Sequence, residues 1–594
     1  MSKDRAGGSR VFNFIKAHKK KYLVGLFFLL VINILQILVP KITGDVVDRL
    51  QEQSIESRNM WIYPAMIMAV SLASFISHYL SRLQINGAGN LFDYETRNAM
   101  FKHLLDLSMS FFQKKATGDI MALTTNDLGA LRMTLSRGIM LLADTIILSI
   151  SSIIIMIGTV NLKLTLLVSI PFPFMIWVMV RFGTIINRRF RRVQDSFADI
   201  TRKAQENIAG IRVIKAFVQE DNEKVNFDRL NQENFQKNMK LAKAQGLFFP
   251  LISFLSSISY LIALVYGGNL ILNGQITLGD FVAFNGYIGV IVRPIHFIGR
   301  IINMIQRGKA SMDRIEELFN EKPEVKDEVQ DEVQLDESSE KELLRGKIEF
   351  KNLTFSYEPD QPPVLKNIKL SIEPGKTLGI IGKVGSGKST IANLLLRLYN
   401  PNSRGQLFID GKDIMDIPLK KLRDSIGYVP QDNFLFSSSI YDNIAFNPYN
   451  TKMEDVRKAA QISQIDETIM EMEKKYNTML GERGVNLSGG QKQRVSIARA
   501  LVKNPSILIL DDCLSAVDTN TERKILEKLR PFMARRTCII IAHRISTIQH
   551  ADEIIVLDEG RIIERGTHQE LLELKGYYYE LYNRQLLEEA IESA

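Results

Sequence analysis

The sequence predicts an α-helical polytopic membrane domain of six transmembrane helices with long intracellular extensions, fused to an α/β domain of the P-loop class. Two observations lead to this prediction. Apolar runs long enough to cross a bilayer recur six times before residue 305, and a glycine-rich loop follows an apolar strand at residue 382. The chain has 594 residues, which is too long for one compact domain. The net charge of +9 and the 46% hydrophobic content fit a soluble or a membrane protein, so the clustering of apolar residues decides.

The apolar runs have the length of about 20 residues that a helix needs to span a bilayer. They cover residues 22–40, 61–81, 138–160, 163–182, 248–272 and 279–304. Short turns join the third span to the fourth and the fifth to the sixth, whereas the connections 82–137 and 183–247 are long, charged and rich in helix formers. Helical arms of this length reach about 40 Å beyond the bilayer. Segments 114–128 and 206–217, near the arm tips, are expected to contact a cytosolic domain.

The N-terminus is basic and precedes the first apolar run. Residues 1–21 hold seven Lys and Arg against the single acid Asp4. A signal peptide has this order too, but no small-residue cleavage pattern follows, so a first span with a cytoplasmic N-terminus fits better. Residues 8–18 are expected to form an amphipathic helix on the membrane surface. Cys513 and Cys538 are the only cysteines and lie far downstream, so reduced thiols are expected rather than a disulfide.

Composition divides the chain into three parts. A transmembrane domain is predicted at residues 1–318, an acidic linker at 319–345, and an α/β domain with a C-terminal helix at 346–594. The linker is nearly free of aromatic residues, which is typical of a segment without its own core. The third part alternates apolar strands with helical segments, which is typical of a sheet covered by helices.

A phosphate-binding loop lies between the apolar strand TLGII and a helical segment. It consists of Gly382, Lys383, Val384, Gly385, Ser386, Gly387, Lys388, Ser389 and Thr390. Glycines allow backbone N–H groups to surround phosphates, Lys388 reaches the β and γ phosphates, and Ser389 can ligate Mg²⁺. The plain alternative is a glycine turn before a helix. The complete strand, loop and helix pattern disfavours that alternative.

Two further motifs follow the phosphate loop. Residues Leu487–Gln491 read LSGGQ, and an apolar strand then ends in Asp511 and Asp512. A strand that places a carboxylate beside the phosphate loop completes a Mg²⁺ site, so Asp511 is predicted to be a metal ligand. Alone, LSGGQ could be a helix N-cap with flexible glycines. Its position between the phosphate loop and the Asp511 strand favours a nucleotide contact.

With these motifs in this order, nearly the whole chain resembles an ATP-binding cassette (ABC) exporter half-transporter, in which six spans are fused to one ABC ATPase domain in the type I exporter fold. The resemblance implies ATP and Mg²⁺ as cofactors, the lipid bilayer as surroundings, and a second half-transporter as partner. Two ATPase domains then meet head to tail, and each ATP lies between the phosphate loop of one chain and the LSGGQ of the other.

The resemblance also implies roles for single residues, each of which has a plainer explanation when taken alone. For the nucleotide, it implies that Tyr357 stacks on adenine, that Gln431 ligates Mg²⁺ and couples to the membrane domain, and that His543 contacts the γ phosphate. The partner's ATP is implied to bind to Ser488, Gly489, Gly490 and Gln491. For contacts between domains, it implies that Gly481–Gly484 touches the coupling helices and that Ser515–Asp518 communicates across the dimer. Tyr357 by itself could be a strand aromatic, and His543 a core histidine.

Asp512 departs from the family pattern, which has a glutamate at this catalytic position to polarise the attacking water. Aspartate is one methylene shorter, and a displacement of about 1 Å can cost about 100-fold in rate. The site is therefore expected to bind MgATP but to hydrolyse it slowly. A poor acid beside an intact LSGGQ resembles the degenerate-site, C-type subunit of heterodimeric bacterial multidrug exporters. A homodimer of low turnover is the alternative, and the retained His543 keeps it open.

The expected function is ATP-driven export of hydrophobic or amphiphilic compounds, multiple drugs among them, by alternating access. The expected location is the plasma membrane of a bacterium, with the ATPase domain in the cytoplasm. Candidate cavity-lining residues are Asp144, Asn285, Arg293, Pro294 and His296. Six spans exclude a soluble ABC ATPase, no nucleic-acid partner is expected, and the fused domains and long arms favour an exporter over an importer. A lipid or peptide exporter and a nonhydrolytic regulatory subunit are the alternatives.

Overall fold

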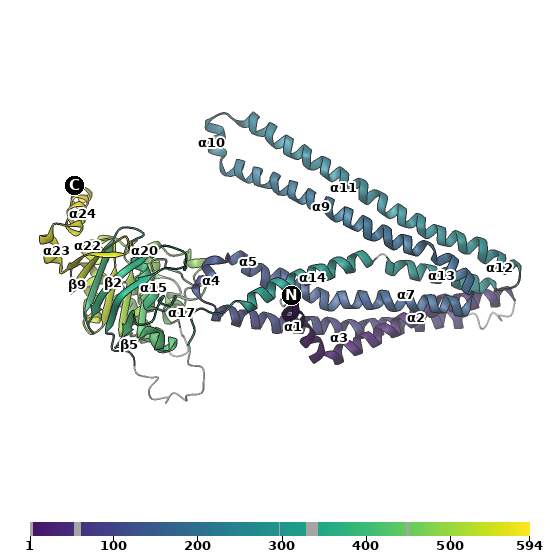
Figure 1. The fold of residues 1–594 in the computed structure, drawn as a ribbon, viewed down its shortest axis with the longest axis horizontal. Helices are drawn as coiled ribbons and strands as arrows, with labels where there is room; N and C mark the ends of the chain where they lie inside the picture. Colours follow the sequence, from purple (N-terminus) through teal and green to yellow (C-terminus); the bar gives the residue numbers. More distant parts are fainter. Residues whose placement is uncertain (1–3, 53–60, 296, 328–342, 447–450, 594) are drawn as a thin grey trace. The chain divides into compact units, whose positions relative to one another are not determined.

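The computed structural model describes residues 4–52, 61–295, 297–327, 343–446 and 451–593, and Figure 1 shows its course. The chain forms two compact units. Unit 1 comprises Met1–Leu105 and Ala116–Glu321, and unit 2 comprises Asp106–Lys115 and Lys322–Ala594. Most of the predicted acidic linker, residues 328–342, lies outside the described residues, as does the candidate lining residue His296.

The described part of unit 1 is helical. Its α-helices are α1 (Asp4–Ala17), α2 (Lys19–Gln51), α3 (Ile62–Asp106), α5 (Thr117–Ala122), α6 (Leu128–Met133), α7 (Ile139–Thr159), α8 (Leu162–Ser169), α9 (Pro171–Ala209), α10 (Ile211–Ala216), α11 (Glu220–Ile262), α12 (Gly268–Leu272), α13 (Leu278–Ile295) and α14 (Ile298–Asn320). Short π-helical turns at Leu123–Asp127, Thr134–Gly138 and Ala263–Gly267 join some of them into longer rods.

Six of these rods are long and apolar enough to cross a membrane, which confirms the predicted six spans. They are Lys19–Gln51, Ile62–Asp106, Thr117–Gly158, Leu162–Ala209, Glu220–Leu272 and Leu278–Asn320. Each extends beyond its apolar run at one end or both, because the charged flanking sequences are themselves good helix formers. Pro40 does not end the first rod, since it lies inside α2, which continues to Gln51.

Two features position the ends of these rods. Helices α9 and α11 run side by side as a long hairpin with α10 at its tip (Figure 1). Helix α1 covers the predicted surface-helix segment, and its Phe14 meets the ring of Phe92 edge to face at 5.1 Å. The guanidinium of Arg10 lies 3.5 Å from the ring centre of Phe319. Helix α1 is therefore anchored to α3 and α14 by aromatic contacts.

Unit 2 is an α/β domain, as the sequence predicted. Its strands are β1 (Ile348–Phe355), β2 (Leu365–Ile372), β3 (Thr377–Gly382), β4 (Leu407–Ile409), β5 (Lys412–Asp413), β6 (Ile426–Val429), β7 (Ile507–Asp511), β8 (Thr537–Ile541), β9 (Glu553–Asp558) and β10 (Arg561–Gly566). Its α-helices are α4 (Met109–Lys114), α15 (Lys388–Leu395), α16 (Leu419–Ser425), α17 (Ile440–Ala445), α18 (Met453–Ile462), α19 (Asp466–Glu471), α20 (Gly489–Val502), α21 (Thr519–Met533), α22 (Ile545–Ile548), α23 (His568–Leu574) and α24 (Tyr577–Ser593).

The strands form two sheets. One has the order β2-β1-β4-β5 and is antiparallel throughout. The other has the order β10-β9-β3-β8-β7-β6, in which all neighbours are parallel except β9 and β10. Strands β7 and β8 are fully buried, which is why they read as continuous apolar runs in the sequence. The parallel strands end at one edge, and this edge carries the candidate site.

A buried arginine secures the N-terminal edge of unit 2. Arg397 is 1% exposed, and its guanidinium donates to the carbonyl oxygens of Ile417 at 2.8 Å and Lys326 at 3.2 Å. The carboxylate of Asp327 lies 3.7 Å away. The segment after α14 is thus tied to the core by a charged side chain that water cannot reach.

Replacing Arg397 with alanine should destabilise the protein by about 3–5 kcal/mol, because the carbonyl oxygens and the carboxylate that now face the guanidinium would lose their partner. The midpoint of thermal unfolding of the full-length chain in detergent measures this loss. The matched control is Arg404→Ala, which removes the ion pair to Asp416 from a half-exposed site. That change should cost less than about 1 kcal/mol. Equal shifts for the two variants would contradict the structural role of Arg397.

Candidate nucleotide-binding site

The sheet brings the predicted catalytic residues to one edge. In the strand register, Ile380 of β3 lies opposite Ile541 of β8, and Ile541 lies opposite Asp511 of β7. The phosphate loop, His543 and Asp512 follow these strand ends directly, and Gln431 lies two residues beyond the end of β6. Ligands of open α/β sheets bind beside the carboxyl ends of the strands. The four predicted segments therefore meet where such a ligand binds.

The phosphate loop has a backbone that only glycine fits at its first position. Gly382 has φ +155°, and a Cβ there would lie 2.0 Å from the carbonyl oxygen of Leu557. The ammonium of Lys388 lies inside the loop and donates to the carbonyl oxygens of Gly382 at 2.9 Å and Lys383 at 2.8 Å. The buried hydroxyl of Ser386 has no hydrogen-bond partner among the described residues. A spare buried hydroxyl and a central ammonium suit a triphosphate.

Lys388 and Asp511 form a coupled charge pair behind the loop. Burial lowers the pKa of the Lys388 ammonium, against the opposing charges of Asp511 and Asp512. Burial likewise raises the pKa of Asp511, which is 2% exposed, against a hydrogen bond from Ser389. A divalent cation beside Asp511 would favour its ionised form. No cluster of three or more His, Cys, Asp or Glu side chains occurs among the described residues, so a cation here depends on oxygen ligands such as Ser389, Asp511 and phosphate.

Asp512 occupies an unusual backbone position. Its φ is +46°, in the left-handed region that aspartate tolerates better than most residues. The Asp512 N–H donates to the carbonyl oxygen of Ile541 at 2.8 Å, and its own carbonyl accepts from the Ser515 hydroxyl at 3.1 Å. The backbone is fixed on both sides, so a shorter side chain cannot be offset by a shift of the main chain. Aspartate fits this fold without strain but falls short of a glutamate's reach.

The LSGGQ segment forms a fully capped helix start. The Ser488 hydroxyl accepts from the Gln491 N–H at 3.3 Å, and the Gln491 side chain accepts from the Ser488 N–H at 2.9 Å. This capping box begins α20 at Gly489 and leaves the start of the helix exposed, where its dipole favours an anion. A Cβ on Gly490 would lie 2.9 Å from the carbonyl oxygen of Ala516. The helix start therefore packs against the 515–518 loop.

Gln493 connects the LSGGQ helix to that loop, and the sequence motifs did not single it out. Its side chain is 4% exposed, donates to the Ser515 hydroxyl at 3.3 Å and accepts from the Ala516 N–H at 3.0 Å. Ser515 in turn donates to the carbonyl oxygen of Asp512. A continuous hydrogen-bonded path thus joins the LSGGQ helix to the acid that follows β7.

The remaining predicted contacts are placed as follows. Tyr357 is half-buried, and its hydroxyl lies 3.0 Å from that of Thr390 at the end of the phosphate loop. Its ring meets that of Tyr399 edge to face at 4.9 Å, which orients it beside the loop. Gln431 and Val384 are exposed. Lys383 forms a 2.9 Å ion pair with Asp558, so it braces the loop rather than pointing freely outward.

His543 is exposed and follows β8 in a short turn. Gln585 on the C-terminal helix α24 forms two hydrogen bonds to the backbone of this turn. It donates to the carbonyl oxygen of His543 at 2.7 Å and accepts from the Ile545 N–H at 2.9 Å. Between them, Arg544 pairs with the buried Glu522 at 2.8 Å. Sequence motifs could not reveal Gln585, because it lies 42 positions from His543 and belongs to no phosphate-binding pattern.

The change Gln585→Ala removes both hydrogen bonds to the turn that carries His543. It should weaken the retention of ATP at this chain's own site about threefold to tenfold, since each lost hydrogen bond is worth about 1 kcal/mol. Photo-crosslinking of 8-azido-ATP to each chain of the complex measures retention separately. The control is Arg584→Ala on the same helix, where the exposed pair to Glu588 spans 3.8 Å. Unchanged labelling in the Gln585 variant would show that these two hydrogen bonds do not position His543.

The predicted domain-contact segments are split between the units. From the first connection, α4 belongs to unit 2, where Ser110 donates to Glu324 at 2.6 Å and Lys114 pairs with Glu358 at 3.2 Å. This contact lies mainly before the predicted segment 114–128, whose residues from Ala116 onward belong to unit 1. The second predicted segment forms α10 and its flanks in unit 1. None of the α10 residues is buried, and Phe217 is 71% exposed.

The candidate cavity-lining residues of the spans are dispersed. Asn285 is half-buried and donates to the carbonyl oxygen of Phe281 on its own helix at 2.9 Å. Pro294 is buried inside α13, whereas Arg293 is exposed. Asp144 on α7 lies within electrostatic range of Arg293. None of them lines the cavity between α9 and α14 that is described below.

Family models and known proteins agree with this architecture. Residues 22–295 match the model described as "ABC transporter transmembrane region", and residues 365–515 match the model described as "ABC transporter". The chain is 39% identical over 574 residues to "Probable multidrug resistance ABC transporter ATP-binding/permease protein YheI" of Bacillus subtilis, covering 97% of both chains. It is also 33% identical to "Multidrug resistance-like ATP-binding protein MdlA" of Escherichia coli, covering 98% of this chain and 97% of the other.

A lipid transporter and a solved exporter are similar as well. The chain is 34% identical to "ATP-dependent lipid A-core flippase" of Syntrophus aciditrophicus, covering 89% of this chain and 86% of the other. A solved structure described as "Structure of a bacterial Atm1-family ABC exporter with ATP bound" superposes with a TM-score of 0.75 at 28% identity. That match covers 95% of this chain and 98% of the other.

Proposed function

Because the chain belongs to the ABC transporters, with the exporter arrangement of six spans and one ATPase domain, we propose that it is the degenerate-site subunit of a heterodimeric multidrug exporter. It is a multi-pass membrane protein whose nucleotide-binding domain is cytoplasmic. The proposal assigns two unequal ATP sites to the dimer. This chain's phosphate loop belongs to the slow site, and its LSGGQ belongs to the fast one.

At the slow site, Lys388 would meet the phosphates of a bound MgATP, and Ser389, Asp511 and Gln431 would supply oxygen ligands for its Mg²⁺. Asp512 lies where a water-polarising base is needed, but its fixed backbone keeps the carboxylate back by about one methylene, roughly 1 Å. The chain therefore binds MgATP there but hydrolyses it slowly.

At the fast site, the capped start of α20 faces the partner's ATP. The dipole of the helix and the Ser488 hydroxyl stabilise negative charge on the γ phosphate. The path through Gln493 and Ser515 to Asp512 connects this contact to the slow site. Occupancy of one ATP site can thus affect the other site through movement of the 515–518 loop. The observation that carries the proposal is this intact LSGGQ start beside the shortened acid.

The second connection supports a partner chain. At the tip of the α9–α11 hairpin, Ile208 is 74% exposed and Val218 is 79% exposed. An apolar tip on a long charged hairpin needs a covering surface in water. A groove on the partner's ATPase domain is the covering surface that fits a domain-swapped dimer.

Co-expression with a second half-transporter that carries a glutamate after its Mg²⁺ aspartate tests the assembly. The purified complex should contain one copy of each chain and should hydrolyse ATP, whereas this chain alone should do so about 100-fold more slowly. Native mass spectrometry gives the stoichiometry. A homodimer with full turnover would overturn the heterodimer proposal, and a partner that transports fully without this chain would make it a regulatory subunit instead.

Lipid export is the second candidate, because one relative is described as a lipid A-core flippase. Inverted membrane vesicles separate the candidates when they are supplied with a fluorescent dye, a labelled lipid or a labelled peptide. Multidrug export predicts ATP-dependent accumulation of chemically unrelated dyes. Accumulation of lipid alone would replace the multidrug proposal with the lipid one.

A further inference from the structure

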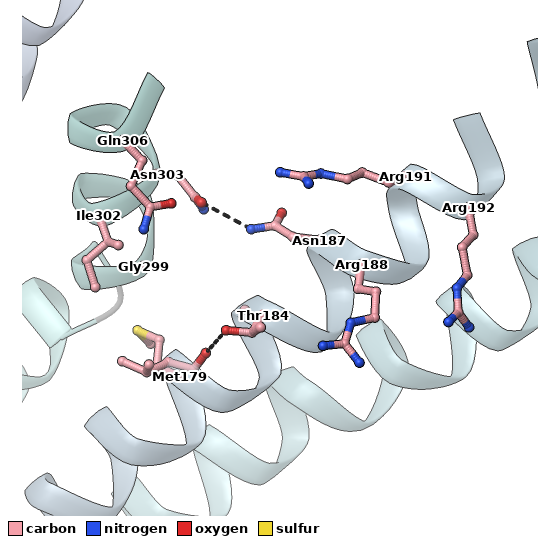
Figure 2. Close-up of a pocket in the computed structure, with 12 residues that line it drawn as sticks. Met179, Thr184, Asn187, Arg188, Arg191, Arg192, Gly299, Ile302, Asn303 and Gln306 are labelled. Carbon is pink, nitrogen blue, oxygen red and sulfur yellow. Dashed lines mark hydrogen bonds between the residues drawn. The ribbon is translucent and has the colours of Figure 1, made fainter. Parts of the chain in front are cut away.

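A cavity with a mixed polar and apolar lining opens within unit 1 between α9 and α14, at the end of the fourth predicted span. Its volume is about 470 Å³, and residues of both helices line it. Figure 2 shows Asn187 and Arg191 of α9 turned toward Asn303 and Gln306 of α14. None of the membrane residues that the sequence singled out lines this cavity, so it is a separate feature.

Three arginines of α9 are among the residues that line the cavity. They are Arg188, Arg191 and Arg192, and none of the twelve described lining residues is acidic. Within the part of the chain that the structure describes, no carboxylate lies at ion-pair distance from any of the three. An anion bound beside the Arg191 guanidinium would therefore be stabilised.

The polarity of the cavity changes along α9. Met179 and Val180, the last part of the predicted span, line one end, Asn187 follows, and the arginines line the other end. Twelve residues separate Met179 from Arg191, which is about 18 Å along a helix. This distance matches an amphiphile whose apolar part stays at the membrane end and whose charged group reaches the arginines.

The facing helix adds neutral polar groups. Asn187 donates to the side-chain oxygen of Asn303 across the cavity at 3.1 Å, and Gln306 lies one turn further along α14. In Figure 2 the Arg191 guanidinium extends toward Asn303 and Gln306, whereas Arg188 and Arg192 point to the other side of α9. Arg191 is therefore the arginine best placed to share a ligand with α14.

We propose that this cavity binds the anionic headgroup of an amphiphile, a phosphate or a carboxylate, as cargo enters from the cytoplasmic leaflet. Arginine suits such a group because its planar guanidinium donates two parallel hydrogen bonds to paired oxygens. The inference rests on the proposed export function and adds the charge of one class of cargo. Arginines beyond a span also occur for topology alone, but Arg191 in addition lines a cavity together with Asn187, Asn303 and Gln306.

Binding of radiolabelled dodecyl phosphate to the heterodimer in phosphatidylcholine nanodiscs tests the site. The comparison probe is dodecyltrimethylammonium, which has the same chain length and the opposite charge. Arg191→Gln should weaken binding of dodecyl phosphate about tenfold, the loss of one charge-assisted hydrogen bond, and leave the cationic probe unchanged. Arg191→Lys should recover part of the affinity. The control is Arg202→Gln, whose exposed pair to Asp199 lies on α9 away from the cavity.

Three outcomes would overturn the proposal. The first is equal affinity of wild type and Arg191→Gln for dodecyl phosphate. The second is equal loss of both probes, which would make Arg191 structural. The third is loss of the dimer in the Arg191 variant, which would place the arginine at the subunit interface.

Two further arms distinguish the source of the headgroup and protect the test from failure of the function. Phosphatidylglycerol added to the nanodiscs should compete only weakly if the site takes cargo, whereas complete competition would identify a resident lipid and overturn the cargo assignment. ATP-dependent uptake of a neutral dye into inverted vesicles tests export itself. If no compound is taken up, the proposed function fails, while selective binding of the anion would still establish the headgroup site.

Discussion

Replacing Ser488 with arginine should reduce ATP turnover of the complex at least about 100-fold, the scale seen when one group that stabilises transition-state charge is removed. The Ser488 hydroxyl caps α20 and forms half of a reciprocal capping box with Gln491. Arginine removes the cap and fills the exposed helix start with a long side chain. The partner's ATP would then lose both the hydroxyl and close access to the helix dipole.

Steady-state phosphate release from the purified heterodimer measures this effect. Ser488→Thr is the matched control, because threonine also caps a helix start, and its turnover should stay within about threefold of wild type. ATP binding at this chain's own phosphate loop should persist in the arginine variant, as photo-labelling would show. Full turnover in Ser488→Arg would mean that this LSGGQ does not serve the hydrolysing site.

The phosphate-binding edge of the sheet could be predicted from sequence because each of its parts has a local signature. An apolar strand followed by glycines and a lysine predicts the loop at Gly382, and an apolar strand that ends in acids predicts Asp511. The parallel register then brings these strand ends together, as a consequence of topology rather than of any single residue. The roles assigned to these residues stay predictions.

Gln493 and Gln585 could not be predicted, for a physical reason. Each forms hydrogen bonds to backbone groups of a turn that is distant in sequence. Such a glutamine has no recognisable sequence motif around it. The left-handed backbone of Asp512 was hidden as well, although it explains why aspartate is tolerated there. The sequence marked Asp512 as unusual, and the fold adds that its main chain is held in place.

The α9–α14 cavity shows a second limit of sequence patterns. Lys and Arg beyond a span are expected from topology, so Arg191 and its neighbours carried no special signal. Only the facing helix reveals that they line a half-open cavity together with Asn303. Likewise, the apolar run ended at Pro40, whereas α2 continues to Gln51, because a proline in a long helix removes one hydrogen bond without always ending the helix.

The second large effect concerns the acid after the Mg²⁺ aspartate in each chain. On the proposed assignment, Asp512→Asn should leave turnover of the heterodimer within about twofold of wild type, because the proposed slow site does not depend on this carboxylate to polarise water. The equivalent glutamate-to-glutamine change in the partner should lower turnover at least about 100-fold, because it removes the working base. The contrast arises from one methylene at a backbone position that cannot move.

The most direct test compares phosphate release from three heterodimers under the same conditions: wild type, Asp512→Asn in this chain, and the amide variant of the partner. Each should first be shown to bind two nucleotides, so that a loss of turnover reports chemistry rather than binding. Near-normal turnover with Asp512→Asn and near-complete loss with the partner variant is the predicted result. Equally severe losses from both changes would contradict the asymmetric sites, since both acids would then take part in hydrolysis.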